Sequence, residues 1–288
     1  MPSRRVVVLV FAFWMMTLGL AFYRDLWPRL SASGPPPIAI DLADEATPNL
    51  QVRWSVVRGD QKIGKLTTRM VYVEADDSVK FVHQYYQIEI KIAGQTILIP
   101  ELSTTTRVTR AGELREQSME GKMGVLIAGQ TLEAHAKVVG RVENGAYLSH
   151  CWISHPVKFD RELDPIPVPE GQALTPLQPV NRIANVRPGQ TWAVREIDPL
   201  RDAIASMLRK EGEQFGLKLP EPAREPLIAE VLSSPQVRNW ADTETSCWVI
   251  EYRGRAARAR TWVRVTDGKV LRQEAIQDDD RIALERED

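Results

Sequence analysis

The stretch Gly59–Lys65, GDQKIGK, matches the first seven positions of a phosphate-binding P-loop. The eighth position of that motif is Ser or Thr, whose hydroxyl binds magnesium, and here it is Leu66. A P-loop also opens a helix, whereas the residues that follow alternate between polar and apolar in the manner of a strand. The stretch therefore predicts a hairpin turn, and we expect no nucleotide to bind.

Three residues that bind metals or act as nucleophiles, His150, Cys151 and His155, lie close together. A structural zinc site needs four ligands, and the other two histidines are distant in the sequence. A thiol nucleophile needs a base held by a third group, and no neighbour supplies one. Residues 278–280, three aspartates, lack the spacing of a calcium loop. We expect no catalytic residue, no metal and no cofactor; a hydrolase that uses scattered carboxylates stays a third alternative.

The chain has two cysteines, Cys151 and Cys247. In an exported compartment they could form a disulfide, and the chain-entropy model gives a loop of about 100 residues roughly 4.7 kcal/mol. The alternative is two separately buried thiols, since a free cysteine behaves as a small core hydrophobe. The sequence leaves both alternatives open.

Residues 6–23 contain no charged side chain, and arginines stand on both sides of them. A run of this length is just sufficient to span a bilayer. We therefore predict that residues 1–30 form an uncleaved signal anchor with a transmembrane helix; a cleaved signal peptide is the alternative. The positive charges at the amino terminus favour a single-pass protein of the bacterial inner membrane with its body in the periplasm. The net charge of −1 does not indicate a nucleic-acid partner.

Residues 31–49 include three successive prolines and predict an extended stalk. Residues 50–288 then form one exported, β-rich domain. Alternating apolar residues and turn signals predict an antiparallel meander over residues 50–153. In its third strand, Phe81 and Tyr85 alternate with Tyr86 and Ile88, so both faces of this strand are apolar. Such a strand is covered on both sides or faces a ligand cavity.

Prolines crowd residues 155–189 and exclude a central strand there, so we expect an extended connection over one face of the sheet. Asp198 and Pro199 predict the start of a helix over residues 199–211. Residues 219–235 read as a linker with a helical turn around residues 227–232. A second meander follows over residues 243–287, with an Asp-Gly hairpin signal at Asp267-Gly268.

The predicted fold is thus mainly β, a curved antiparallel sheet with one main packing helix. A single helix covers only part of such a sheet, which leaves space for an apolar cavity. We expect this cavity to be lined by residues of the third strand, the helix and the closing meander: Tyr85, Tyr86, Leu200, Ile204, Met207, Leu208 and Trp262. The alternative is a filled core in which the proline-rich connection occupies the same space.

The segment Cys247–Glu274, CWVIEYRG…TWVRVTDGKVLRQE, resembles the final strands of periplasmic half-barrels of the lipoprotein-carrier type. The resemblance implies a curved sheet that wraps around helices and encloses acyl chains. It therefore implies a non-enzymatic protein that binds a lipid or an envelope protein partner. The carriers are freed or lipidated, whereas this chain keeps a helical anchor. An accessory subunit of an envelope complex, which docks by strand addition, is the alternative.

Overall fold

The computed structural model describes residues 13–20, 50–92, 95–127, 130–154, 158–169, 178–194, 197–214, 227–254, 257–277 and 280–287. The first half of the sheet contains β1 (Gln51–Arg58), β2 (Gln61–Val73), β3 (Ser78–Ile92), β4 (Gln95–Thr109), β5 (Leu114–Ile127), β6 (Gln130–Glu143), β7 (Ala146–Ile153), β8 (Phe159–Glu162) and β9 (Ile166–Pro167). The second half contains β10 (Thr191–Val194), β11 (Leu227–Val231), β12 (Gln236–Trp240), β13 (Thr243–Arg253), β14 (Ala257–Arg264), β15 (Val270–Gln277) and β16 (Asp280–Arg286). A helix, α4 (Pro199–Gln214), and a short 3₁₀ turn, η2 (Glu74–Asp76), complete the elements used below.

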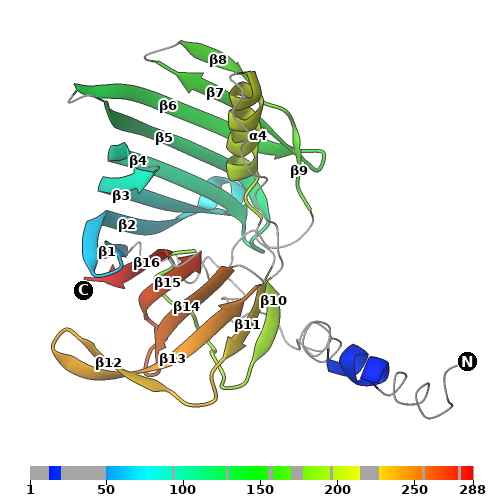
Figure 1. Cartoon of the computed structure of the whole chain (residues 1–288), viewed down its shortest axis with the longest axis vertical. Coiled ribbons are helices and arrows are strands. Elements are labelled where there is room, and N and C mark those ends of the chain that lie inside the picture. The colour runs from blue at the N-terminus through cyan, green and yellow to red at the C-terminus, as the bar shows by residue number, and fades with distance from the viewer. Residues whose placement is uncertain are drawn as a thin grey trace, which may run out of the picture.

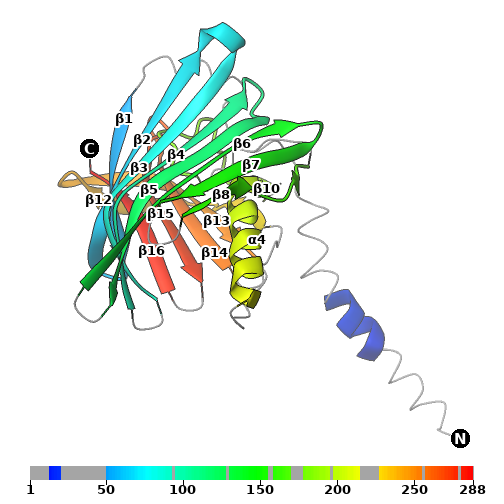
Figure 2. The ribbon, with the colours of Figure 1, turned by 90° about the horizontal axis from the view of Figure 1, so that it is seen from above.

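All of these strands belong to one open, curved antiparallel sheet, which bends around α4 (Figures 1 and 2). Its strand order is β10-β11-β13-β14-β15-β16-β1-β2-β3-β4-β5-β6-β7-β8, with β12 beside β13 and β9 beside β7. The two predicted meanders are both present. The pairing of β16 with β1, for example Val56 opposite Leu284, joins them into a single sheet.

The inner face of the sheet, here called the concave face, carries the apolar residues of the alternating strands. Val52, Trp54 and Val56 of β1 belong to its largest hydrophobic cluster. The sheet curves tightly where β6 passes β7: a Cβ on Gly140 would overlap the ring of Tyr147. The Tyr147 hydroxyl donates to the carbonyl oxygen of Gln117 at 3.0 Å. The missing side chain at position 140 therefore lets the strands bend around a buried aromatic ring.

The helix α4 begins as predicted and ends three residues later than predicted, at Gln214. The carboxylate of Asp198 accepts the backbone N–H of Arg201 at 3.1 Å, which is the geometry of an N-cap. Leu200 and Ala203 of α4 are buried against Val138 and Cys151 of the sheet. The apolar stripe of the helix thus covers the end of the sheet around β6 and β7, together with β9.

A second cover for the concave face comes from residues 178–187, here called the strap. Ile183 is buried in the cluster that contains β1, and Val180 and Val186 pack against it. Backbone bonds fix the strap: Ile183 N–H donates to the Gly268 carbonyl at 2.9 Å, and Val270 N–H donates to the Asn181 carbonyl at 3.0 Å. The expected connection over one face of the sheet is confirmed for this part, while β8 and β9, within the same connection, extend the sheet by pairing with β7.

One expectation for the linker before the second meander was wrong, and one strand after it lies in residues for which no element was predicted. Residues 227–231 form the strand β11, not a helical turn, because they lie between β10 and β13, with Ala229 opposite both Trp192 and Tyr252. Residues 236–240 form β12, which folds back along the start of β13. Local alternation does not reveal these strands, because β11 pairs with stretches that are distant in the sequence and β12 is mostly polar.

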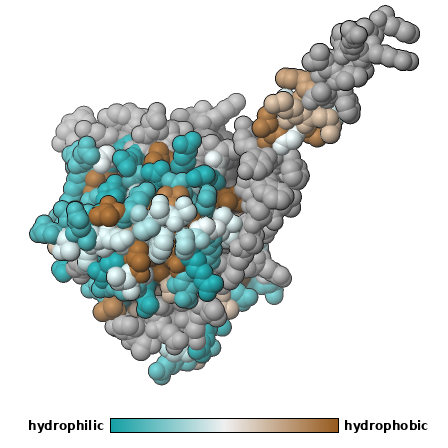
Figure 3. Space-filling model, turned by 90° about the horizontal axis from the view of Figure 1, so that it is seen from below, coloured by the Kyte–Doolittle hydropathy of each residue, from teal (hydrophilic) through white to brown (hydrophobic). Residues whose placement is uncertain are grey.

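The predicted anchor falls largely outside the described residues, as does the whole predicted stalk, residues 31–49. Residues 13–20, within the predicted anchor, are helical, and their apolar side chains are exposed. They form the mostly hydrophobic-coloured projection in Figure 3, whereas the described surface of the body in that view is mostly hydrophilic. Among the residues that the structure describes, no helix has the length and apolar character needed to cross a membrane.

Candidate functional site

The concave face between α4 and the strap is the best candidate for a binding site. Four half-buried apolar residues lie there. Tyr85 and Ile99 pack on the cluster under the strap, and Met119 packs on the cluster under α4. Leu102 lies opposite Tyr85 across β3 and β4 and is also half-buried. These four residues, here called the central strip, connect the two covered parts of the sheet.

Polar residues border the central strip and position α4. The side-chain amide of Gln117 donates to Asp198 at 3.4 Å, and its oxygen accepts the N–H of Leu200 at 3.2 Å. Gln117 is buried, and its carbonyl also accepts the hydroxyl of Tyr147. Burial, and secondarily the charge of Asp198, raises the pKa of Tyr147, so this phenol stays neutral. The start of α4 is thereby fixed to β5.

His83 lies on the same face and contacts the strap. Its ring is buried and hydrogen-bonds the backbone of Pro179. Burial lowers its pKa to about 4, and the bond to Pro179 opposes this only partly. The bond between this buried, neutral imidazole and Pro179 fastens the strap to β3.

The structure brings together some, but not all, of the residues predicted to line a cavity. Tyr85 lies in the central strip, and Leu200, Ile204 and Met207 lie in the cluster under α4. Leu208 is 50% exposed on the helix. Successive residues of a strand face opposite sides, so Tyr86 and Trp262 lie on the outer face, because their neighbours Tyr85 and Val263 belong to the concave cluster. These two residues and Leu208 are not brought to the concave face.

The pattern that suggested a cavity has a different cause. The third strand does not alternate regularly through its length: Gln87 has φ 53°, and the register passes from Tyr86 opposite Glu101 to Ile88 opposite Ile99. The left-handed conformation of Gln87 interrupts the alternation without changing the register, and Ile88 lies on the side of Tyr85, where it is buried. Fewer apolar side chains of this strand therefore lie on the outer face than its sequence indicates.

Trp262 instead belongs to a cluster on the outer face that sequence reasoning missed. It packs with Cys247, Val249 and Leu271, and Trp240 of β12 borders them. The guanidinium groups of Arg238 and Arg272 lie 5.0 and 5.7 Å from the Trp262 ring centroid. The signal for this cluster was the pair of tryptophans, but only the unpredicted strand β12 places them together.

Of the two alternatives for the cysteines, the structure has the two separate thiols. Both residues are free and buried, Cys151 in the cluster under α4 and Cys247 in the outer cluster. The disulfide between them is not formed, because they lie on β7 and β13, which are far apart in the strand order, and on opposite faces. Burial raises the pKa of each thiol, which disfavours the nucleophilic thiolate.

The remaining sequence motifs are structural in the described residues. The P-loop-like stretch forms the β1–β2 hairpin turn as predicted, with Arg58 opposite Gln61. His150 bonds Asp160 at 2.7 Å. His155 and two of the three aspartates of residues 278–280 lie outside the described residues. No group of three or more potential metal ligands occurs among the residues that were described.

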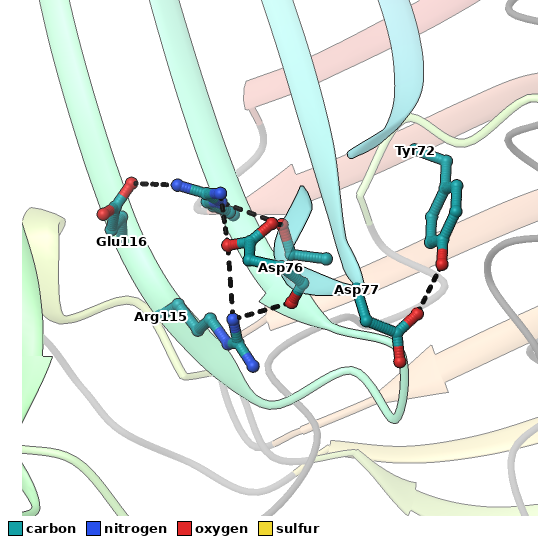
Figure 4. A network of polar contacts seen from close by, with 7 residues as sticks. Tyr72, Asp76, Asp77, Arg115 and Glu116 are labelled. Carbon is teal, nitrogen blue, oxygen red and sulfur yellow. Dashed lines mark hydrogen bonds and ion pairs between the residues drawn. The ribbon is translucent and has the colours of Figure 1, made fainter. Parts of the chain in front are cut away.

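A dense polar network lies at the β2–β3 turn (Figure 4). Asp76 pairs with Arg107, and it accepts a bond from Ser78 at 2.7 Å and one from Arg115 at 3.3 Å. The hydrogen bond from Arg107, followed by that from Ser78, lowers the pKa of Asp76. Arg107 also pairs with Glu116 at 3.3 Å. The network fastens η2 to β4 and β5, and its groups are already paired with one another.

Comparison with known proteins adds nothing to this geometry: no family model, no curated protein and no solved structure matches the chain.

Proposed function

We propose that this chain is a non-enzymatic binding protein whose concave face accepts an apolar ligand such as an acyl chain. The observation that supports the proposal is the partial cover of this face. The strap covers the region of β1, α4 covers β6 and β7, and the central strip between them is only half-buried. Apolar surface with a few polar groups at its border is typical of small-molecule sites.

The proposal includes a location. Residues 6–23 anchor the chain in the bacterial inner membrane, residues 31–49 hold the body away from it, and the body lies in the periplasm. The uncharged run and its flanking arginines support this arrangement. A protein tied to one membrane would present or sense a lipid at that membrane rather than carry it freely between membranes.

Native mass spectrometry of the full chain, purified from its host in a mild detergent, tests the proposal. We expect copurifying lipid, or a mass shift on addition of palmitate. Leu102→Trp fills the central strip and should abolish that shift. Leu148→Trp, at an exposed position of the sheet, is the matched control and should retain it. A clean apo mass with no shift in any of the proteins would refute acyl binding.

A second function, docking of an envelope protein by strand addition, is supported by the open sheet. Among the described residues its order ends at β10 on one side and β8 on the other, so each of these strands has one side without a neighbouring strand there. A photo-crosslinking residue at Ala193, exposed on β10, should capture one defined envelope protein, whereas the same residue at Leu148 should not. Equal labelling from both positions would refute this docking mode.

A further inference from the structure

The outer face of the sheet carries two hollows that adjoin each other over β4 to β8. The first, of about 540 Å³, is lined by His135, Lys137, Trp152, Ile153, Ser154, Lys158, Phe159 and Asp160. The second, of about 500 Å³, has among its lining the outward side chains of Ser103, Thr105, Ser118, Glu120, His135 and Lys137. Both share His135 and Lys137, so they form one continuous groove, here called the outer groove. Each hollow has the size of an ordinary small-molecule site.

Strand register aligns the groove's side chains in a row. Ser103 lies opposite Glu120, Glu120 opposite Lys137, Lys137 opposite Trp152, and Trp152 opposite Asp160. Neighbouring strands are about 4.8 Å apart, so this row of five residues extends roughly 19 Å across the sheet. A linear ligand lying across the strands could contact every member of the row.

One end of the row presents an aromatic platform. Trp152 is 38% exposed. His150 stacks on its indole with ring centroids 4.2 Å apart, and Asp160 holds His150 through the 2.7 Å bond. His150 does not line the hollow, whereas Trp152 does, so the indole face opposite His150 is open to a ligand. The platform is thus held in place from behind, with one face available for stacking.

The remainder of the groove is polar and balanced in charge. Glu120 pairs with Lys137 at 3.1 Å and with His135 at 3.5 Å, and all three side chains are nearly half exposed. The lining contains three carboxylates and three lysines, together with hydroxyls from Ser103, Thr105 and Ser118. This balance favours neither an anion such as nucleic acid nor a cation.

We propose that the outer groove binds a neutral oligosaccharide. A pyranose ring has an apolar C–H face, which fits the open face of Trp152. Its hydroxyls both donate and accept hydrogen bonds, which suits the alternating carboxylates, amines and hydroxyls of the row. A linear chain of linked rings matches the elongated form of the groove, and its neutrality matches the balanced charge. This site lies on the opposite face of the sheet from the proposed acyl site.

Titration calorimetry of the full chain in detergent tests the proposal with three neutral tetrasaccharides: chitotetraose, cellotetraose and maltotetraose. We expect at least one of them to bind. Trp152→Ala should weaken that binding by about tenfold or more, because the stacking contact is lost. Leu148→Ala is the matched control: it has the same 38% exposure on the same strand and face, and it should bind like the parent.

Trp152→Phe separates loss of the platform from loss of the fold, because it keeps an aromatic ring and should retain most of the affinity. Leu102→Trp, which fills the central strip on the other face, should leave saccharide binding unchanged, so the two proposed sites fail or succeed independently. The proposal is overturned if none of the three saccharides binds, or if Trp152→Ala and Leu148→Ala bind equally well.

Discussion

The contact between His83 and the strap predicts a specific loss of stability in acid. The pKa of His83 is about 4 in the folded protein, because the ring is buried, against about 6.5 for an unfolded histidine. Between these two values the unfolded chain binds more protons than the folded chain. His83 therefore leaves stability unaffected above pH 6.5 and lowers it progressively as the pH falls toward 4. At pH 4.5 the loss amounts to about 2.5 kcal/mol.

The assay compares urea unfolding of the full chain and its His83→Gln variant at pH 7.5 and pH 4.5, in the same detergent. Glutamine keeps a donor for the backbone of Pro179 and does not titrate. Carboxylates with lowered pKa, such as Asp267, whose pKa is about 2 chiefly because of its bond to Arg264, act equally in both proteins. The parent should therefore lose about 2.5 kcal/mol more than the variant. Losses that agree within about 0.5 kcal/mol would refute the reasoning.

Three further predictions concern the turn at the strap, the P-loop-like turn and the anchor. Gly268→Ala should destabilise the protein by about 2 kcal/mol or more, because Gly268 has φ 75° and the new Cβ would lie 2.6 Å from the carbonyl oxygen of Ile183. Gly145→Ala, at φ 76° with open space around it, should cost only about 1 kcal/mol, and equal unfolding midpoints would contradict this account. Lys65→Ala should leave the melting temperature unchanged, and calorimetry should detect no ATP binding to the parent; micromolar affinity would show the turn to be a nucleotide site. A periplasm-dependent phosphatase fused after residue 40 should be active, and activity only of a cytoplasmic reporter would reverse the topology.

Local patterns in the sequence predicted the elements that depend on local physics. Alternation and turn signals together located β1 to β7 and β13 to β16. Asp198 with Pro199 located the start of α4, because a cap and a helical stripe are properties of neighbouring residues. The pairing of β16 with β1 was not predictable, since nothing in either strand specifies a partner more than 200 residues away. Strands β11 and β12 were missed for a different reason: each has only five residues, too few to show a clear two-residue period.

The candidate site was predicted only in part. The face of the sheet on which a side chain lies depends on backbone irregularities that the alternation of the sequence does not show. The left-handed backbone of Gln87 turns Ile88 toward the concave face, whereas Tyr86, on the other side of Gln87, stays on the outer face. Trp262 was expected to line the cavity. In β14, however, its neighbour Val263 faces inward, so Trp262 faces outward. A one-residue shift exchanges the two faces of a strand, so residue type alone cannot assign a face.

The same geometry explains why the two faces of this sheet suit different ligands. Strands β4 to β6 direct Leu102, Met119 and Val138 inward, where α4 and the strap leave the central strip half covered. The alternate positions of these strands carry Ser103, Glu120 and Lys137, which point outward in register with one another. An apolar ligand on one face and a polar, elongated ligand on the other follow from the two-residue period of the same strands. Substitutions on one face should therefore leave binding at the other unchanged, which is why Leu102→Trp and Trp152→Ala can test the two proposals separately in one protein.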